Sequence, residues 1–293
     1  MDCHPAATRS APEGPQSWGQ SASAIDGFCN RVLTAGYAAS LFLAPRCAGE
    51  HEPLVEEMAS AGVEVGLFVQ PQTMYGRGFS RFLGQYRREE QYAIVAAAVE
   101  EFQDVVGHRP QSVRPAMYSA SDDTFGVLFE HGFRQGSVSS PGRRVTKHGA
   151  IWTAAAQDPH YVDPRSRLRS GDLPFFEIPL TTDATQERGG LSPELAIENG
   201  TFTQWHKPLI DAQLQRMEAE NVSFRCLCFV TRNCFGYHVD DDQRSRTLDS
   251  VIQYLDSLGE RYEVTPTTIA GAHAFYRTGL TPGPSPSSIE RGG

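Results

Sequence analysis

Hydrophobic and polar positions along the chain follow helix-like and strand-like periods in turn. Between Ser21 and Gly36, apolar residues recur three or four positions apart, which predicts an amphipathic helix that ends at a glycine. Continuous apolar runs at 37–45 and 63–69 are each typical of a buried strand, and a short helix is predicted between them near 52–62. Repeated strand–helix steps of this kind favour parallel strands joined by helical crossovers.

The same alternation continues towards the C-terminal end. Further helices are predicted at 88–107, 121–133 (with Ser121 as the N-cap), 203–221, 243–259 and 267–277, and further strands at 111–117, 136–140, 175–180, 223–230 and 262–266. No linker interrupts the series, so we expect one α/β domain with a barrel-like arrangement over residues 1–276. Residues 277–293 are rich in proline, glycine and serine and are expected to form a disordered tail.

Composition narrows the classes of partner. The chain has 293 residues, of which 40% are hydrophobic and 21% charged, as in an ordinary globular protein. Its net charge of -9, without a long basic run, argues against nucleic-acid binding. No apolar stretch approaches the roughly 20 residues that a membrane helix needs, and the N-terminus has no hydrophobic signal core. We therefore expect a cytoplasmic protein with no membrane partner.

The six cysteines give no sign of a metal or redox motif. None forms a C-x-x-C pair, which argues against a zinc ribbon or a thioredoxin-type site. Cys226 and Cys228 alternate within a predicted strand and would lie on one face of it. The cysteines are interpreted as small core residues in a reducing compartment.

Three segments carry a family resemblance. The stretch "SVRPAMYSASDDTFGVLFEHGFRQGSVSSPGRR" (112–144) resembles the third motif of the polysaccharide deacetylases, the NodB-homology family or carbohydrate esterase family four. In that motif an Arg-x-Pro strand end precedes a helix of the form D-x-T-F-x-x-L-x-x-x-G-F. The stretch "AGVEVGLFVQPQ" (61–72) is similar to the second motif, and residues 228–264 are similar to the closing segment.

The resemblance implies a distorted (β/α) barrel that hydrolyses an acetyl group on a carbohydrate or a related small molecule. In the family, a divalent metal, typically zinc, is held by one Asp and two His and lowers the pKa of its bound water. A second Asp takes the proton of that water, and a late His protonates the leaving amine. The Arg of the third motif orients the basic Asp.

Several of these roles can be carried over to matching positions. Arg114 fits the orienting arginine, with a salt bridge at a strand end as the alternative, and His238 fits the late acid, with a half-exposed loop position as the alternative. Asp2 fits the first motif, and His4 lies close enough in sequence to be a substitute metal ligand. Because the sequence begins at Met1, part of the first strand is expected to be lacking.

The second motif departs from the family pattern. Its two metal-binding histidines correspond to Phe68 and Gln72. A phenyl ring has no lone pair to donate and an amide oxygen is a poor zinc ligand, so the implied zinc or other divalent metal lacks both imidazoles. Phe68, Gln72, Tyr118 and Trp152 are instead predicted to contact the substrate.

Three hypotheses about function follow. The first is a metal-dependent, deacetylase-like hydrolase with an altered site. The second is a catalytically inactive relative that binds a carbohydrate. The third is an N-terminally truncated gene product.

Overall fold

The computed structural model describes residues 1–9, 11–74, 77–186, 188–239 and 242–279. The helices are α1 (Trp18–Thr34), α2 (Pro45–Glu50), α3 (Glu52–Ser60), α4 (Arg88–Val106), α5 (Thr124–Glu130), α6 (Lys207–Ala219), α7 (Gln243–Ser257) and α8 (Ile269–Thr278). The strands are β1 (Asp2–Cys3), β2 (Ser40–Leu43), β3 (Glu64–Val69), β4 (Ser112–Pro115), β5 (Gln135–Gly136), β6 (Arg144–Val145), β7 (Ala150–Ile151), β8 (His160–Asp163), β9 (Ser166–Ser170) and β10 (Leu173–Glu177).

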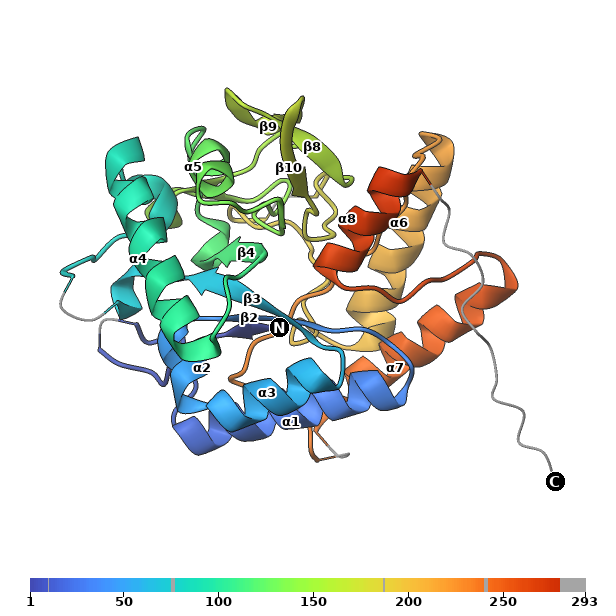
Figure 1. Ribbon diagram of the computed structural model, residues 1–293. Coiled ribbons are helices and arrows are strands. Elements are labelled where there is room, and N and C mark those ends of the chain that lie inside the picture. Colours follow the sequence, from blue (N-terminus) through green and yellow to red (C-terminus); the bar gives the residue numbers. More distant parts are fainter. Residues whose placement is uncertain (10, 75–76, 187, 240–241, 280–293) are drawn as a thin grey trace.

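One mostly parallel sheet organises the molecule. Its eight strands lie in the order β1-β2-β3-β4-β5-β10-β8-β9, and β6 and β7 form a separate antiparallel pair. The strands from β1 to β5 and β10 are parallel, whereas β8 and β9 are antiparallel additions. Figure 1 shows the helices arranged around the central strands, with β8 and β9 projecting at one side. The mixed α/β architecture expected from the strand–helix alternation is confirmed.

An irregular segment, residues 228–233, links the two ends of the parallel series. The backbone N–H of Asp2 donates to Thr231 O at 2.8 Å, and the N–H of Thr181, just beyond β10, donates to Cys228 O at 3.2 Å. In the described chain this segment makes isolated bridges, such as Asp2 with Arg232, and no regular strand. The predicted strand at 223–230 is therefore wrong, because its backbone groups bond to irregular neighbours.

The first strand is short but in place. Asp2 and Cys3 pair in parallel with Phe42 and Leu43 of β2, and Phe42 N–H donates to Met1 O at 2.9 Å. The start of the described chain therefore occupies a strand position next to β2.

Two local predictions are corrected by the structure. Helix α5 begins at Thr124 with Asp123 at its N-cap, so Ser121 lies two residues before the cap; its hydroxyl accepts from Gln91 Nε2 at 2.8 Å and from Asp123 N at 3.3 Å. Residues 262–266 form no strand, because Tyr262 turns towards α6 and its hydroxyl donates to Glu218 at 2.6 Å. The predicted stripe of α1 is confirmed, with Ile25 and Cys29 fully buried.

The first residues of four neighbouring strands form a polar network at the amino-terminal ends of the sheet. Ser40 and Ser112 both donate to the Glu64 carboxylate, the first of them at 2.7 Å. Gln135 Nε2 donates to Ser112 Oγ at 3.1 Å, and the N–H of Ala270 at the start of α8 donates to Glu64 at 3.1 Å. The beginning of α8 thus covers this end of the sheet.

Two further expectations concern the whole chain. None of the helices in the described ranges is long and apolar enough to span a membrane. Helix α8 ends at Thr278, so residues 277–278 of the predicted tail belong to a helix, and residues 280–293 lie outside the described ranges. The division into a domain at 1–276 and a disordered tail at 277–293 stays a prediction.

Candidate active site

A buried ion pair joins the first and fourth strands of the sheet. Arg114 of β4 donates from Nη1 to Asp2 Oδ1 of β1 at 2.8 Å, and the two side chains are 2% and 10% exposed. Burial acts to lower the pKa of the Arg114 guanidinium, but the Asp2 carboxylate, together with Tyr118 and Cys228, raises it. Asp2, which the family resemblance assigned to the first motif, and Arg114, which it assigned as the orienting arginine, therefore lie in direct contact.

Arg114 reaches Asp2 across two intervening strands because Gly66 leaves room. The Arg114 guanidinium carbon lies 4.7 Å from the centre of the Phe42 ring on β2. The same ring lies over Gly66 of β3, where an added Cβ would come within 2.9 Å of Ser112 O and 3.0 Å of Phe42. A larger residue at position 66 would displace the phenyl ring on which the guanidinium rests.

Because side chains alternate along β1, Asp2 and Cys3 lie on opposite faces of the strand. Successive side chains of a strand point to opposite faces, so Asp2 shares a face with His4 and not with Cys3. Cys3 is fully buried, and burial, with Cys47 of α2 and Cys29 of α1 nearby, raises the pKa of its thiol. Cys3 therefore faces the helices and not the ion pair.

His4 is held by neighbours that do not bind metals well. Its Nδ1 lies 3.1 Å from Gln70 Oε1, and the Phe68 ring packs edge-on against the imidazole with centroids 4.8 Å apart. Burial lowers the pKa of the His4 imidazole. Asn233 fixes the backbone on both sides, accepting from His4 N at 2.9 Å and donating to His4 O at 2.8 Å.

The residues present do not fit the zinc or other divalent metal that the resemblance implied. Asp2 is engaged by Arg114, Phe68 offers no donor atom, and Gln72 offers only an amide. Across the described ranges, no group of three or more His, Cys, Asp or Glu residues is arranged to hold a metal ion. The predicted ligands Asp2 and His4 thus share a face but lack partners for a metal centre.

His238, predicted as the late acid, lies beside α1. Its side chain is 46% exposed, and Nε2 is 3.4 Å from Asp26 Oδ2. Between His238 and either Asp2 or Arg114, the described residues show no hydrogen bond or ion pair. The structure therefore does not bring His238 together with the ion pair.

Arg232 takes the position next to Asp2 instead, and the sequence analysis missed it. Arg232 and Asp2 form a parallel bridge, and Arg232 Nε donates to Glu198 Oε1 at 2.9 Å. Asp2 therefore lies between two arginine-bearing segments. The available sequence signal was that Arg232 lies two residues beyond the apolar run 226–230, because strand ends in α/β proteins carry site residues.

The predicted substrate-contacting residues lie at different depths. Tyr118 is 6% exposed, and its ring lies 5.7 Å from the Arg114 guanidinium carbon and 4.8 Å from that of Arg143. Trp152 is fully buried and donates from Nε1 to Tyr118 O at 2.7 Å; Phe68 is also fully buried. Gln72 is partly buried. Substrate contact by these residues stays a prediction, and only Gln72 and Tyr118 have exposed surface.

Comparison with known proteins places the fold. No model of a known protein family matches the sequence, and no curated protein does. A protein assigned as a polysaccharide deacetylase from Mycobacterium smegmatis matches in structure with a TM-score of 0.56 and 14% identity, over 92% of this chain and 82% of that one. A Pseudomonas aeruginosa PAO1 protein with the same assignment matches with a TM-score of 0.52 and 15% identity, over 88% and 74%.

The chain has the polysaccharide deacetylase fold. The α/β fold of the deacetylases, which the sequence resemblance implied, is thereby confirmed, whereas closure of the strands into a barrel stays a prediction. An allantoinase named Puue has the same fold, with a TM-score of 0.53 and 14% identity over 88% of this chain and 74% of that one. Because proteins with different activities share the deacetylase fold, the substrate has to be argued from the site itself.

Three polar atoms near the strand ends of this deacetylase fold have no hydrogen-bond partner. They are Tyr118 Oη, Gln72 Oε1 and Glu198 Oε2, all buried atoms. Burial raises the pKa of the Tyr118 phenol well above its usual range, so the hydroxyl is protonated and can donate. Buried polar groups are normally hydrogen-bonded, so these atoms are available to a ligand.

Met117 and Tyr118 also have strained backbone geometry. Both residues have φ of 57°, in the left-handed region that residues with side chains rarely adopt. Strain of this kind persists where surrounding contacts hold it, often at binding sites. The Trp152–Tyr118 hydrogen bond is one such contact.

Proposed function

We propose that this protein is a deacetylase-fold protein that binds a neutral, hydroxyl-rich carbohydrate at the carboxyl ends of its strands without metal-dependent hydrolysis. The observation that carries the proposal is the pairing of His4 with Gln70 and Phe68, in the place where the family resemblance puts metal ligands. A phenyl ring and an amide leave too few donors for zinc.

The ligand class follows from the unpartnered groups. Gln72 Oε1 and Glu198 Oε2 accept hydrogen bonds, and the Tyr118 hydroxyl can donate or accept. A sugar supplies hydroxyl groups that match both kinds of partner. The acidic composition of the chain also disfavours a polyanionic ligand.

Calorimetric titration with a chito-oligosaccharide tests this proposal. Binding in the millimolar to micromolar range should be weakened about tenfold by Tyr118→Phe, since one hydrogen bond in a buried site is worth about 1 kcal/mol or more. Gln135→Ala, at the opposite end of the sheet, serves as the control for binding. Equal affinity of wild type and Tyr118→Phe would rule out this placement of the ligand.

The Asp2–Arg114 pair favours a second candidate, an acetyl-group hydrolase. In this alternative Asp2 takes a proton from the attacking water, and Arg114 holds the carboxylate in place. Acetate release from an acetylated chito-oligosaccharide, lost in Asp2→Asn, would support hydrolysis. Elemental analysis of the same preparation tests the metal: near one equivalent of zinc lost in His4→Ala would overturn the metal-free proposal. The cytoplasmic location is likewise a proposal.

A further inference from the structure

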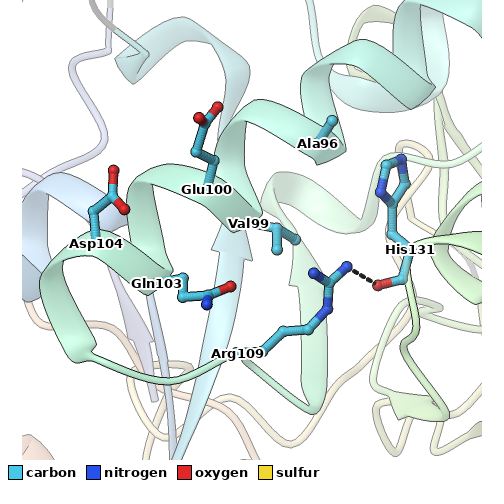
Figure 2. Close-up of a pocket in the computed structure, with 7 residues that line it drawn as sticks. All are labelled: Ala96, Val99, Glu100, Gln103, Asp104, Arg109 and His131. Atoms are coloured by element: carbon cyan, nitrogen blue, oxygen red, sulfur yellow. Dashed lines mark hydrogen bonds between the residues drawn. The ribbon is translucent and has the colours of Figure 1, made fainter.

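A hollow of about 340 Å³ lies between α4 and the segments that carry Arg109 and His131, and none of the residues of the candidate active site line it. Its apolar lining residues are Ala96 and Val99 of α4. Figure 2 shows Glu100 and Asp104 projecting from α4 on one side, and Arg109 and His131 on the other. The volume is near the lower limit for pockets that take small molecules.

The two carboxylates on α4 lack compensating charges. Glu100 and Asp104 are four residues apart, so they are neighbours on one helix face, where like charges repel. Both side chains are exposed, and within the described chain neither forms a hydrogen bond or an ion pair. A cation between them would relieve the repulsion.

Arg109 presents the opposite charge across the hollow. One Nη2–H donates to the carbonyl oxygen of His131, as the dashed line in Figure 2 shows. This bond holds the guanidinium at the hollow that Val99 also lines. The described residues offer no other partner for its remaining N–H groups, so it can bind a carboxylate with two parallel hydrogen bonds.

His131 supplies a polar atom without a partner. The residue is 7% exposed, and its ring packs against Tyr92 with centroids 4.1 Å apart. Nε2 is buried and unpaired. Burial lowers the pKa of the His131 imidazole, so at neutral pH the ring is uncharged and can accept or donate one hydrogen bond.

We propose that this hollow binds a small zwitterion, an α-amino acid with an apolar side chain. The carboxylate binds Arg109, the ammonium lies between Glu100 and Asp104, and the side chain covers Ala96 and Val99. A simple anion would leave the two acids unpaired, and a simple cation would leave Arg109 unpaired. The site is separate from the carbohydrate site proposed above and does not depend on it.

A titration with L-leucine followed by amide NMR shifts tests the proposal. N-acetyl-L-leucine lacks the ammonium and 3-methylbutylamine lacks the carboxylate, so each analogue removes one charge. We expect saturable shifts in residues 96–109 and at His131, with a Kd on the order of 1 mM for leucine and at least about fivefold weaker binding of both analogues. Absence of saturable shifts, or equal binding of the three probes, overturns the proposal.

Substitutions separate the two charged sides. Arg109→Gln and Asp104→Asn should each weaken leucine binding by about fivefold, because each removes one partly exposed charge pair. Arg169→Gln is the matched control, since Arg169 is an exposed arginine on β9. Unchanged affinity in Arg109→Gln, with its circular dichroism spectrum intact, rejects the site, as does an equal loss in Arg169→Gln.

Discussion

The two ends of the parallel strands differ in how completely their buried polar groups are hydrogen-bonded. At the amino-terminal ends, Ser40, Glu64, Ser112 and Gln135 satisfy one another. At the carboxyl ends Asp2 and Arg114 pair, but Tyr118, Gln72 and Glu198 each keep a buried atom without a partner. An unpaired buried group costs stability, so a saturated network is suited to holding the fold and an unsaturated one to accepting a ligand.

The largest expected effect is on the buried ion pair between Asp2 and Arg114 at the carboxyl end. Arg114→Met should lower the free energy of unfolding by about 3–5 kcal/mol, because it leaves the Asp2 carboxylate buried without its partner. Urea unfolding measures the change. In the double variant Asp2→Asn/Arg114→Met the uncompensated charge is gone, and much of the loss should be recovered. A loss below about 1 kcal/mol in Arg114→Met would show that the pair is solvated.

A smaller effect concerns Glu177, a buried acid with full hydrogen bonding at the carboxyl end. It accepts from Val138 N at 3.0 Å and from Ser139 N at 2.8 Å, yet burial raises its pKa from 4.5 to about 7. The folded state therefore binds the proton more tightly than the unfolded state. Stability should fall as pH rises from 4.5 towards 7, by on the order of 3 kcal/mol from this group.

The measurement is the difference in unfolding free energy between wild type and Glu177→Gln across this pH window. Burial lowers the pKa of His4 and His160, so their titration changes stability with the opposite sign. Those contributions are present in both proteins and cancel in the difference. A difference that does not vary with pH would mean that Glu177 is ionised in the fold at all these pH values.

The smallest expected change in unfolding free energy comes from removing one hydroxyl group at each end of the strands, that of Ser112 or that of Tyr118. Ser112→Ala should cost about 1–3 kcal/mol, because Glu64 and Gln135 both lose a partner, whereas Tyr118→Phe should cost less than about 0.5 kcal/mol. Both are measured by urea unfolding. If Tyr118→Phe proved as destabilising as Ser112→Ala, the Tyr118 hydroxyl would have a partner in solution, and the contrast between the two ends would fail.

Much of the fold could be predicted from the sequence because it depends on local periodicity. The apolar stripe of α1 and the apolar runs of β2 and β3 are visible in the sequence because these residues are buried against neighbouring elements. Residues 223–230 have the same apolar alternation without forming a regular strand. There the backbone bonds to loop atoms, such as Cys228 N to Thr181 Oγ1 at 2.8 Å, and local pattern carries no information about such distant partners.

The candidate site was predictable to the extent that it follows strand ends. Asp2 and Arg114, which the resemblance assigned to one site, lie in contact because both are on parallel strands of one sheet. Arg232 was missed because its role depends on which segment lies beside β1. His238 lies with Asp26, because the buried Tyr237 anchors the preceding turn against α1.

The alternation of side chains along β1 limits which residues could bind a metal if this protein were redesigned as a metalloenzyme. A thiolate at Cys3 could not contribute, since it faces the helices. The natural starting point is the existing imidazole of His4, whose nearest ring is Phe68. Phe68→His would convert that packing contact into a pair of adjacent nitrogen ligands, and Gln72→His could supply a third from the following turn. An engineer would thus begin with two substitutions on one strand end.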